Sequence, residues 1–138
     1  MGMWPDHFES QFYNYFDVND GLRAYTLTGV AVLTFQGGGG GRFKRDTLLV
    51  KVDLPDLPDF PPKNALQLVH WAPLFTLNSI SNDGVANDAA WAVDGWELET
   101  RLDFPTRDIA FNVALAVGDA DGFILRVGYM ISLLGRLV

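Results

Sequence analysis

The sequence IAFNVALAV at residues 109–117, followed by GDADG at 118–122 and FILRVGYMISLL at 123–134, decides the fold expected for this chain. In the first stretch, large apolar side chains occupy the odd positions and small side chains, mostly alanine, occupy the even ones. The second stretch continues this period of two, which is typical of β-strands. Because the Asp and Gly residues between the stretches favour a tight turn, we predict a β-hairpin at the core of an all-β domain.

Four further segments show strand patterns upstream of this hairpin. Residues 24–36 and 47–54 alternate apolar and polar side chains, and Gly29 in the first predicts a bulge or a close backbone approach. Residues 65–71 form a third expected strand. The alternation in residues 90–99 changes phase at Asp94-Gly95, which predicts either a hairpin turn, the interpretation we prefer, or a bulge. We therefore expect an antiparallel β-sandwich or jelly-roll-like fold of six to eight strands, formed by residues 21–138 as a single domain.

Residues 1–20 are unusually rich in aromatic side chains. Phe8, Phe12 and Tyr15 or Phe16 recur at intervals of three to four residues, which places them on one face of a helix, and Pro5 suits the first helical turn. We expect either a short capping helix over residues 6–16 or an arm that packs on a neighbouring subunit, because so dense an aromatic surface would aggregate in water.

Composition and charge argue against several classes of protein. The 138-residue chain carries a formal net charge of −7, which disfavours nucleic-acid binding because phosphates require a basic surface. The first residues contain neither the basic nor the apolar region of a signal peptide, and the apolar runs are only strand-length. We expect a soluble protein that binds neither nucleic acid nor membrane.

Few residues suggest catalysis. The chain has no cysteine, its serines have no clear basic partner, and His70 is a lone histidine on an expected strand. Five glycines at 37–41 lead into a strand and not into the helix that a phosphate-binding loop opens. Glu97 and Glu99 lie on one face of a strand, about 7 Å apart by the strand rise, and two carboxylates can hydrolyse a glycosidic bond. Such a pair on an exposed strand is, however, usually just part of a solvated surface. We expect no enzymatic activity and no cofactor.

Two Asp/Asn-rich loops, at 82–88 and 119–122, supply oxygen ligands suited to calcium. Neither matches the ligand spacing of an EF-hand, and Asp, Asn and Gly are also ordinary turn residues. We therefore predict turns at both places and no metal site.

The favoured functional hypothesis is a non-enzymatic structural subunit of a larger oligomer, such as a virion capsid, decoration or tail component, whose expected partners are copies of itself and other subunits of the assembly. The aromatic segment, a basic cluster on an acidic chain and apolar side chains on the reverse of the last strand support it. The expected interface residues are Trp4, Phe8, Phe12, Tyr15, Phe16, Arg42, Lys44, Arg45, Ile124 and Met130.

The alternative hypothesis is a carbohydrate-binding module. Residues 73–88 are predicted to form a long polar loop beside Trp91, and an aromatic ring with amide and carboxylate groups suits a sugar. The candidate residues are Asn78, Asn82, Asp83, Asn87, Asp88 and Trp91. Over residues 47–134 the order of strand, Phe60-Pro61-Pro62, strand, Trp-containing strand and terminal hairpin resembles the H-type lectins, which are small trimer-forming sandwiches. This resemblance is a pattern of strands without a specific motif, and no binding residue is transferred from it.

Overall fold

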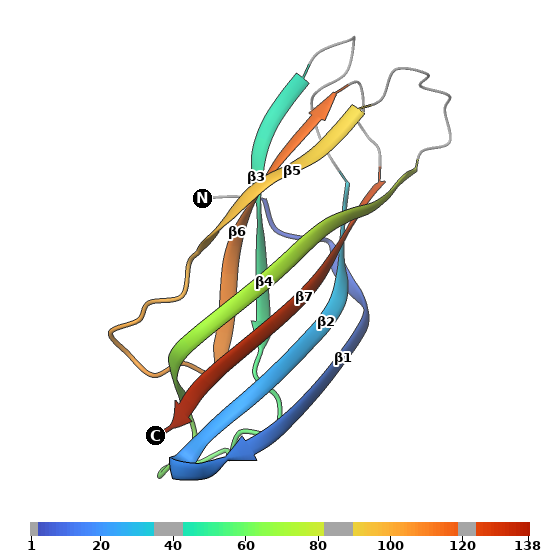
Figure 1. Cartoon of the computed structure of the whole chain (residues 1–138). Helices are drawn as coiled ribbons and strands as arrows, with labels where there is room; N and C mark the ends of the chain where they lie inside the picture. The colour runs from blue at the N-terminus through green and yellow to red at the C-terminus, as the bar shows by residue number, and fades with distance from the viewer. Residues whose placement is uncertain (1–2, 35–42, 82–89, 119–123) are drawn as a thin grey trace.

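Two antiparallel sheets form the molecule (Figure 1). The computed structural model describes residues 3–34, 43–81, 90–118 and 124–138, without the side chains of 43, 78–81, 90 and 91. One sheet has the strand order β1-β2-β7-β4 and the other β3-β6-β5. The strands are β1 (His7–Val18), β2 (Leu22–Thr34), β3 (Phe43–Asp53), β4 (Leu66–Ser81), β5 (Ala90–Leu98), β6 (Asp108–Gly118) and β7 (Ile124–Leu137). The predicted all-β sandwich is confirmed.

The two strands of the deciding stretch do not form the predicted hairpin. β6 pairs with β3 and β5, whereas β7 pairs with β2 and β4, so each strand is central in a different sheet. The prediction was wrong because a period of two shows only that one face of each strand is buried. It does not distinguish strands that pair edge to edge from strands that face each other across a core.

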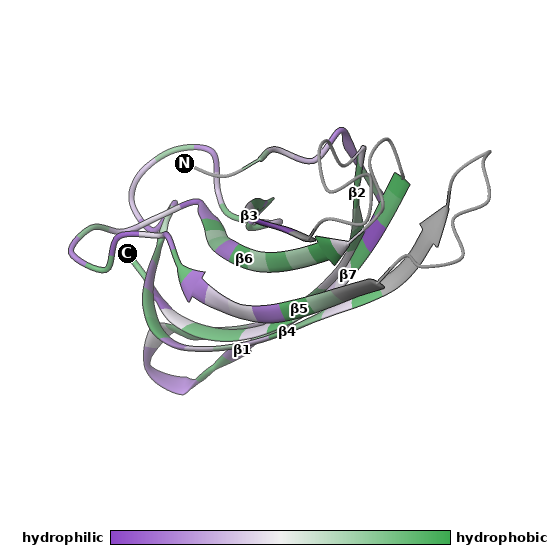
Figure 2. Cartoon of the chain, turned by 90° about the horizontal axis from the view of Figure 1, so that it is seen from above, coloured by the Kyte–Doolittle hydropathy of each residue, from purple (hydrophilic) through white to green (hydrophobic). Residues whose placement is uncertain are grey.

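The core lies between the sheets and is built from the large side chains of the alternating pattern. In β6 the odd residues from Ile109 to Val117 are all buried, and the odd residues of β7 from Leu125 to Leu133 meet them from the other layer. Odd residues of β2 and even residues of β3 complete this core. Figure 2 looks down on the two layers and shows hydrophobic and hydrophilic residues interspersed along their strands.

The aromatic N-terminal segment is a strand, so the predicted helix over residues 6–16 is wrong. β1 pairs with β2 in antiparallel register, interrupted by a bulge between Glu9 and Phe12 where Ser10 has a φ of 53°. A spacing of four residues fits a strand face as well as a helix face. Side chains return to the same face about every two residues in a strand and about every 3.6 residues in a helix, and four is close to a multiple of each. The bulge then inverts the phase, so Phe8 faces the core and Phe12 faces outward.

Bulges also explain two other differences from the expected strands. β4 runs on to Ser81, beyond the predicted end at Trp71, because bulges after Leu68 and after Leu77 break its alternation. Pro73 is tolerated because β4 is an edge strand, so one side of its backbone needs no partner. The preferred turn at Asp94-Gly95 is likewise wrong: β5 continues through that point with a bulge.

A buried arginine closes the end of the sandwich near the β1–β2 turn. The Arg23 guanidinium donates to the Asp17 carboxylate at 2.7 Å, to the Tyr25 hydroxyl at 3.2 Å and to the Asp56 carbonyl at 3.0 Å. It also lies over the Tyr15 ring, 4.2 Å from the centroid. These contacts satisfy the buried charge and tie β1 and β2 to the connector after β3.

Candidate functional site: the outer face of the four-stranded sheet

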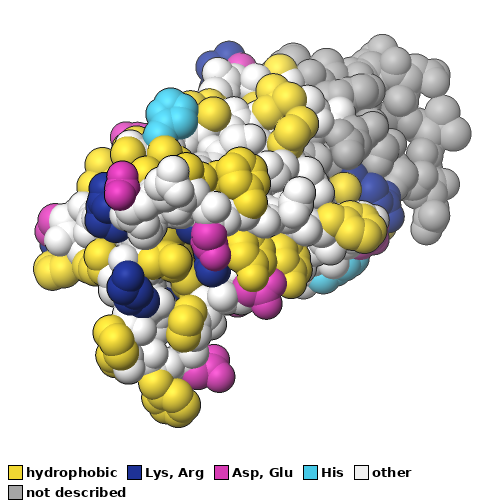
Figure 3. Space-filling model, turned by 60° about the horizontal axis from the view of Figure 1, so that its bottom comes forward, with side chains coloured by type: hydrophobic (Ala, Val, Ile, Leu, Met, Phe, Trp, Pro, Cys, Tyr) yellow, Lys and Arg dark blue, Asp and Glu magenta, His cyan; other side chains and the backbone are white. Residues whose placement is uncertain are grey.

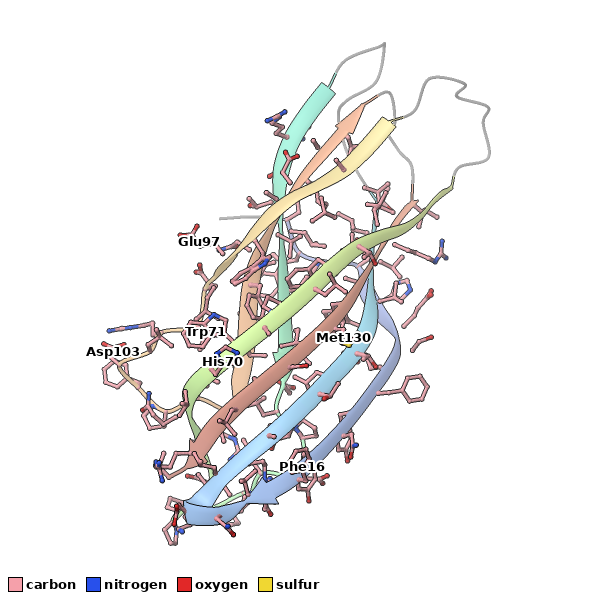
Figure 4. The ribbon with its side chains drawn as sticks, viewed as in Figure 1. Phe16, His70, Trp71, Glu97, Asp103 and Met130 are labelled. Carbon is pink, nitrogen blue, oxygen red and sulfur yellow. The ribbon has the colours of Figure 1, made fainter. Side chains whose placement is uncertain are left out.

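The outer face of the four-stranded sheet, whose strand order is β1-β2-β7-β4, lies on the side away from the core. The register sets its side chains in cross-strand rows, for example Phe12, Thr28, Met130 and Leu74. Figure 4 shows Met130 on β7 in the middle of this sheet, and Phe16 near the end of β1. We call this surface the outer face.

Charged residues occupy only the two ends of the outer face. At one end the Glu9 carboxylate lies 3.5 Å from Arg126 and 3.2 Å from His7. The hydrogen bond from His7, helped by Arg126, holds the pKa of Glu9 below its ordinary value. At the other end Arg136 donates to the Asp20 carbonyl at 2.6 Å.

Between these ends the outer face carries no Asp, Glu, Lys or Arg among the residues that the structure describes there. Its side chains are Phe12, Asn14, Phe16, Ala24, Thr26, Thr28, Val30, His70, Ala72, Leu74, Thr76, Gly128, Met130, Ser132 and Leu134. The chain has a net charge of −7, so a surface across four strands without these charged residues differs markedly from its overall composition.

The same surface exposes large apolar side chains and contains a hollow. Phe12 is 70% exposed, Phe16 64%, Leu74 57% and Met130 45%. A hollow of about 380 Å³ lies between Ser10, Phe12, Gly29, Leu74, Thr76 and Met130. The space-filling view toward the β1–β2 end shows hydrophobic side chains exposed among the charged ones (Figure 3). Exposed apolar area of this kind is typical of an interaction surface.

The structure brings together only part of the predicted interface set. Phe12, Phe16 and Met130 share the outer face, and Ile124 is exposed at the start of β7. Phe8 and Tyr15 instead face the core, where Phe8 packs edge-on against Tyr129 and Tyr15 packs against Tyr25.

The remaining predicted interface residues lie elsewhere. Trp4 is exposed next to β3, Lys44 lies 3.7 Å from Asp46, and Arg45 lies 3.8 Å from Asp94. Arg42 is outside the described residues. The basic cluster is therefore engaged in part by acidic groups of the same chain.

Sequence reasoning missed Leu74 and Val69, which add exposed apolar side chains on β4. Both lie where bulges or a proline hide the strand pattern. The signal that could have found Leu74 is the alternation of Pro73, Phe75 and Leu77 on the core side, read as a strand in a new phase after Val69.

Most residues of the carbohydrate hypothesis cannot be placed. Asn82, Asp83, Asn87 and Asp88 lie outside the described residues, as do the side chains of Asn78 and Trp91, whose backbones belong to β4 and β5. The segment from Pro73 to Ser81, predicted to be loop, is strand. The Asp-rich loop at 119–122, which was considered as a calcium site, also lies outside the described residues.

The weighed catalytic candidates do not form a catalytic arrangement in the described part of the chain. His70 and Trp71 are neighbours on β4 (Figure 4), His70 on the outer face and Trp71 packed on the core. The Glu99 carboxylate accepts a hydrogen bond from Asn112 at 2.6 Å, whereas Glu97 is exposed on β5. Across the described ranges, no three acidic or histidine side chains are grouped to hold a metal ion.

The described residues include no helix that is long and apolar enough to cross a membrane. None of the protein-family models, curated proteins or solved structures compared with this chain matches it.

Proposed function

We propose that this protein is a non-enzymatic structural subunit that assembles with copies of itself through the outer face. The single observation that carries the proposal is the charge-free centre of that face, with Phe12, Phe16, Leu74 and Met130 exposed on it. Contact of these apolar side chains with water is unfavourable, so their burial against another molecule lowers the free energy.

The net charge of the chain favours a second copy of it as the molecule that covers the outer face. Two molecules that each carry a net charge of −7 repel each other, so they associate most readily through surfaces without charge. The centre of the outer face is such a surface, and pairing it with itself leaves no Asp, Glu, Lys or Arg buried without a partner.

Shape supports the same occupant. The Phe16 ring projects from one side of the outer face, and the hollow beside Gly29 and Met130 lies on another part of the same face. A two-fold contact pairs each patch with a different patch of the same surface, so a projection and a hollow on one face complement each other across the axis.

Burial of the four large apolar side chains offsets only part of the cost of association. Full burial of a side chain such as Phe, Leu or Met stabilises by roughly 1.5–3 kcal/mol, and the exposed fractions of Phe12, Phe16, Leu74 and Met130 allow roughly half of that each. The sum of roughly 3–6 kcal/mol, together with the smaller residues between them, acts against an association cost of at least about 4 kcal/mol. The whole face must therefore participate.

The proposed assembly is of the type found in virions, namely a capsid, decoration or tail component. Sandwiches with jelly-roll character are widely used as capsid subunits. A two-fold contact alone gives a dimer, so larger assemblies also require contacts outside the outer face. Electron microscopy of the purified protein would show whether dimers associate further.

A single cysteine can report burial of the outer face, because the chain has none of its own. Ser132→Cys places a thiol at the exposed centre of that face, and Phe60→Cys places one at the highly exposed Phe60, on the connector between β3 and β4. Burial predicts that the thiol at position 132 reacts severalfold more slowly at high than at low protein concentration. The thiol at position 60 should react at one rate throughout. Equal rates at position 132 across concentrations contradict the proposal.

A further inference from the structure

The opposite side of the sandwich carries an open cavity that the assembly proposal does not use. It measures about 360 Å³ and lies over the outer surface of the β3-β6-β5 sheet, bounded by the 99–106 loop. Trp4 and Phe104 are its exposed aromatic residues, and its polar residues are Lys51, Glu99, Thr100, Arg101, Thr106 and Asp108.

Trp4 is held in place by backbone contacts on both sides. Before it, the Met3 amide donates to the Thr47 carbonyl at 2.6 Å and the Met3 carbonyl accepts from Leu49 at 2.8 Å, so this residue continues the edge of β3. After it, the Asp6 amide donates to the Val32 carbonyl at 2.7 Å, and the Asp6 carboxylate accepts from Thr34. The exposed indole therefore stands on a fixed backbone, which reduces the entropy that a ligand must remove.

The opposite wall is also fixed by hydrogen bonds. Thr106 and Leu66 exchange backbone hydrogen bonds at 2.8 and 2.9 Å, and the Ala110 amide donates to the Thr100 hydroxyl at 2.8 Å. The Phe104 ring is covered on one side by the Arg101 guanidinium, 4.7 Å from the ring centroid. The floor contains Ala110, whose small side chain leaves room above the sheet.

The four charged residues that line the cavity sum to zero, and Asp103, which lies outside the lining and pairs with Arg101, adds one negative charge nearby. Lys51 lies 3.6 Å from Asp108, and Arg101 donates to Asp103 at 2.7 Å. Figure 4 shows Asp103 at the tip of the loop, away from the sandwich. Among the lining residues, the two basic side chains match the two acidic ones. Because both basic side chains are already paired with carboxylates, the cavity favours a neutral ligand rich in hydrogen-bonding groups over an anion such as phosphate.

We propose that this cavity binds a neutral saccharide of one or two rings. Aromatic faces pack against the C–H face of a sugar ring, while carboxylates, a hydroxyl and an ammonium exchange hydrogen bonds with its hydroxyls. The cavity supplies both kinds of group, and its volume lies within the range of small-molecule sites. The site is separate from the residue 78–91 region considered from the sequence, and it lies on the other side of the sandwich from the outer face.

The test uses the full chain and a panel of neutral monosaccharides and disaccharides, namely hexoses, N-acetylhexosamines and their dimers. Binding is detected by saturation-transfer NMR and quantified by calorimetry for each sugar that gives a signal. Trp4→Ala should weaken binding about tenfold and Trp4→Phe should retain most of it, because the ring face supplies the contact. Phe60→Ala removes an aromatic ring elsewhere that is even more exposed than Trp4, and it should have no effect.

The outcomes separate the proposal from its competitors. Binding of a neutral sugar that falls in Trp4→Ala and is unchanged in Phe60→Ala supports it. Absence of binding by every member of the panel at about 10 mM, a concentration at which even weak sites are occupied, overturns it. So does binding that is unaffected by Trp4→Ala. If Trp4→Ala lowers the molar mass in solution and no sugar binds, the cavity is a subunit contact and the saccharide proposal is wrong.

Discussion

Replacing Gly29 with alanine is expected to destabilise the fold through a single contact. A Cβ at this position would lie 2.4 Å from the Tyr129 hydroxyl oxygen, 2.6 Å from Cζ and 2.8 Å from Cε1. The Tyr129 ring cannot move away freely, because it is buried, packs edge-on against Phe8 and accepts a hydrogen bond from Gln11 at 3.1 Å.

The expected loss in the free energy of unfolding is about 2 kcal/mol. Overpacking a core costs about 1–3 kcal/mol, and disturbing the hydrogen bond from Gln11 costs about 1 kcal/mol more. The lower entropy of the unfolded alanine variant offsets about 0.4–1 kcal/mol of this loss. Urea unfolding followed by tryptophan fluorescence, at one protein concentration, measures the difference.

A second background shows whether the contact with Tyr129 is the cause. In a Tyr129→Leu protein the ring is gone, so adding Gly29→Ala should change stability by less than about 0.5 kcal/mol. Glu97→Gln, at an exposed position of β5 away from the outer face, is the control and should be nearly neutral. The reasoning is refuted if Gly29→Ala costs the same with and without the Tyr129 ring.

Three further perturbations test the packing and the charges of the fold. The hydrogen bond from Arg23 lowers the pKa of Asp17, so its stabilisation is present above the ordinary value of 3.8 and is lost as the pH falls. A pH series of urea midpoints should show Asp17→Asn less stable at pH 7 and less sensitive to acid than the parent; an unchanged acid slope contradicts this assignment. Burial raises the pKa of the Tyr25 hydroxyl, so its contribution is complete below pH 10 and is lost as the pH rises further. Tyr25→Phe should cost about 1 kcal/mol at pH 7, through the lost hydrogen bond to Pro55, and should reduce the alkaline loss of stability, which the same series at high pH measures. A Cβ on Gly135 would lie 2.3 Å from Leu66 Cγ, so Gly135→Ala should lower the thermal midpoint, and an unchanged midpoint would show that Leu66 moves freely.

The fold class followed from the sequence because it depends on a local property. Alternation along residues 109–117 and 123–134 identifies strands with one buried face. The bulge or close backbone approach predicted at Gly29 is wrong for β2 itself: the β2–β7 register is regular there, the bulge lies in the neighbouring β1, and the close neighbour of Gly29 is the Tyr129 side chain. The pairing of those strands did not follow, because partner choice depends on side chains far apart in the sequence. β6 and β7 could each complete either sheet until the positions of β2, β3, β4 and β5 are known.

The candidate surface was predicted only in part for the same physical reason. Phe12, Phe16 and Met130 were identified as exposed apolar side chains, but a single-residue bulge in β1 and another in β4 decide which neighbours share their face. One inserted residue inverts every later side chain of a strand, and no simple periodicity shows where it lies. The cavity beside Trp4 was missed altogether, because it joins the N-terminal segment, β3 and the 99–106 loop.

The most direct test of self-assembly through the outer face is the molar mass in solution of the unmodified chain and of Phe16→Glu, measured by light scattering over a range of concentrations. The account predicts a multimer for the unmodified chain and a folded monomer for Phe16→Glu, because burying a carboxylate in an apolar contact is costly. Phe60→Glu adds the same charge away from the outer face and should remain multimeric. A monomeric unmodified chain at every concentration, or a multimer that Phe16→Glu leaves intact, would contradict the proposal.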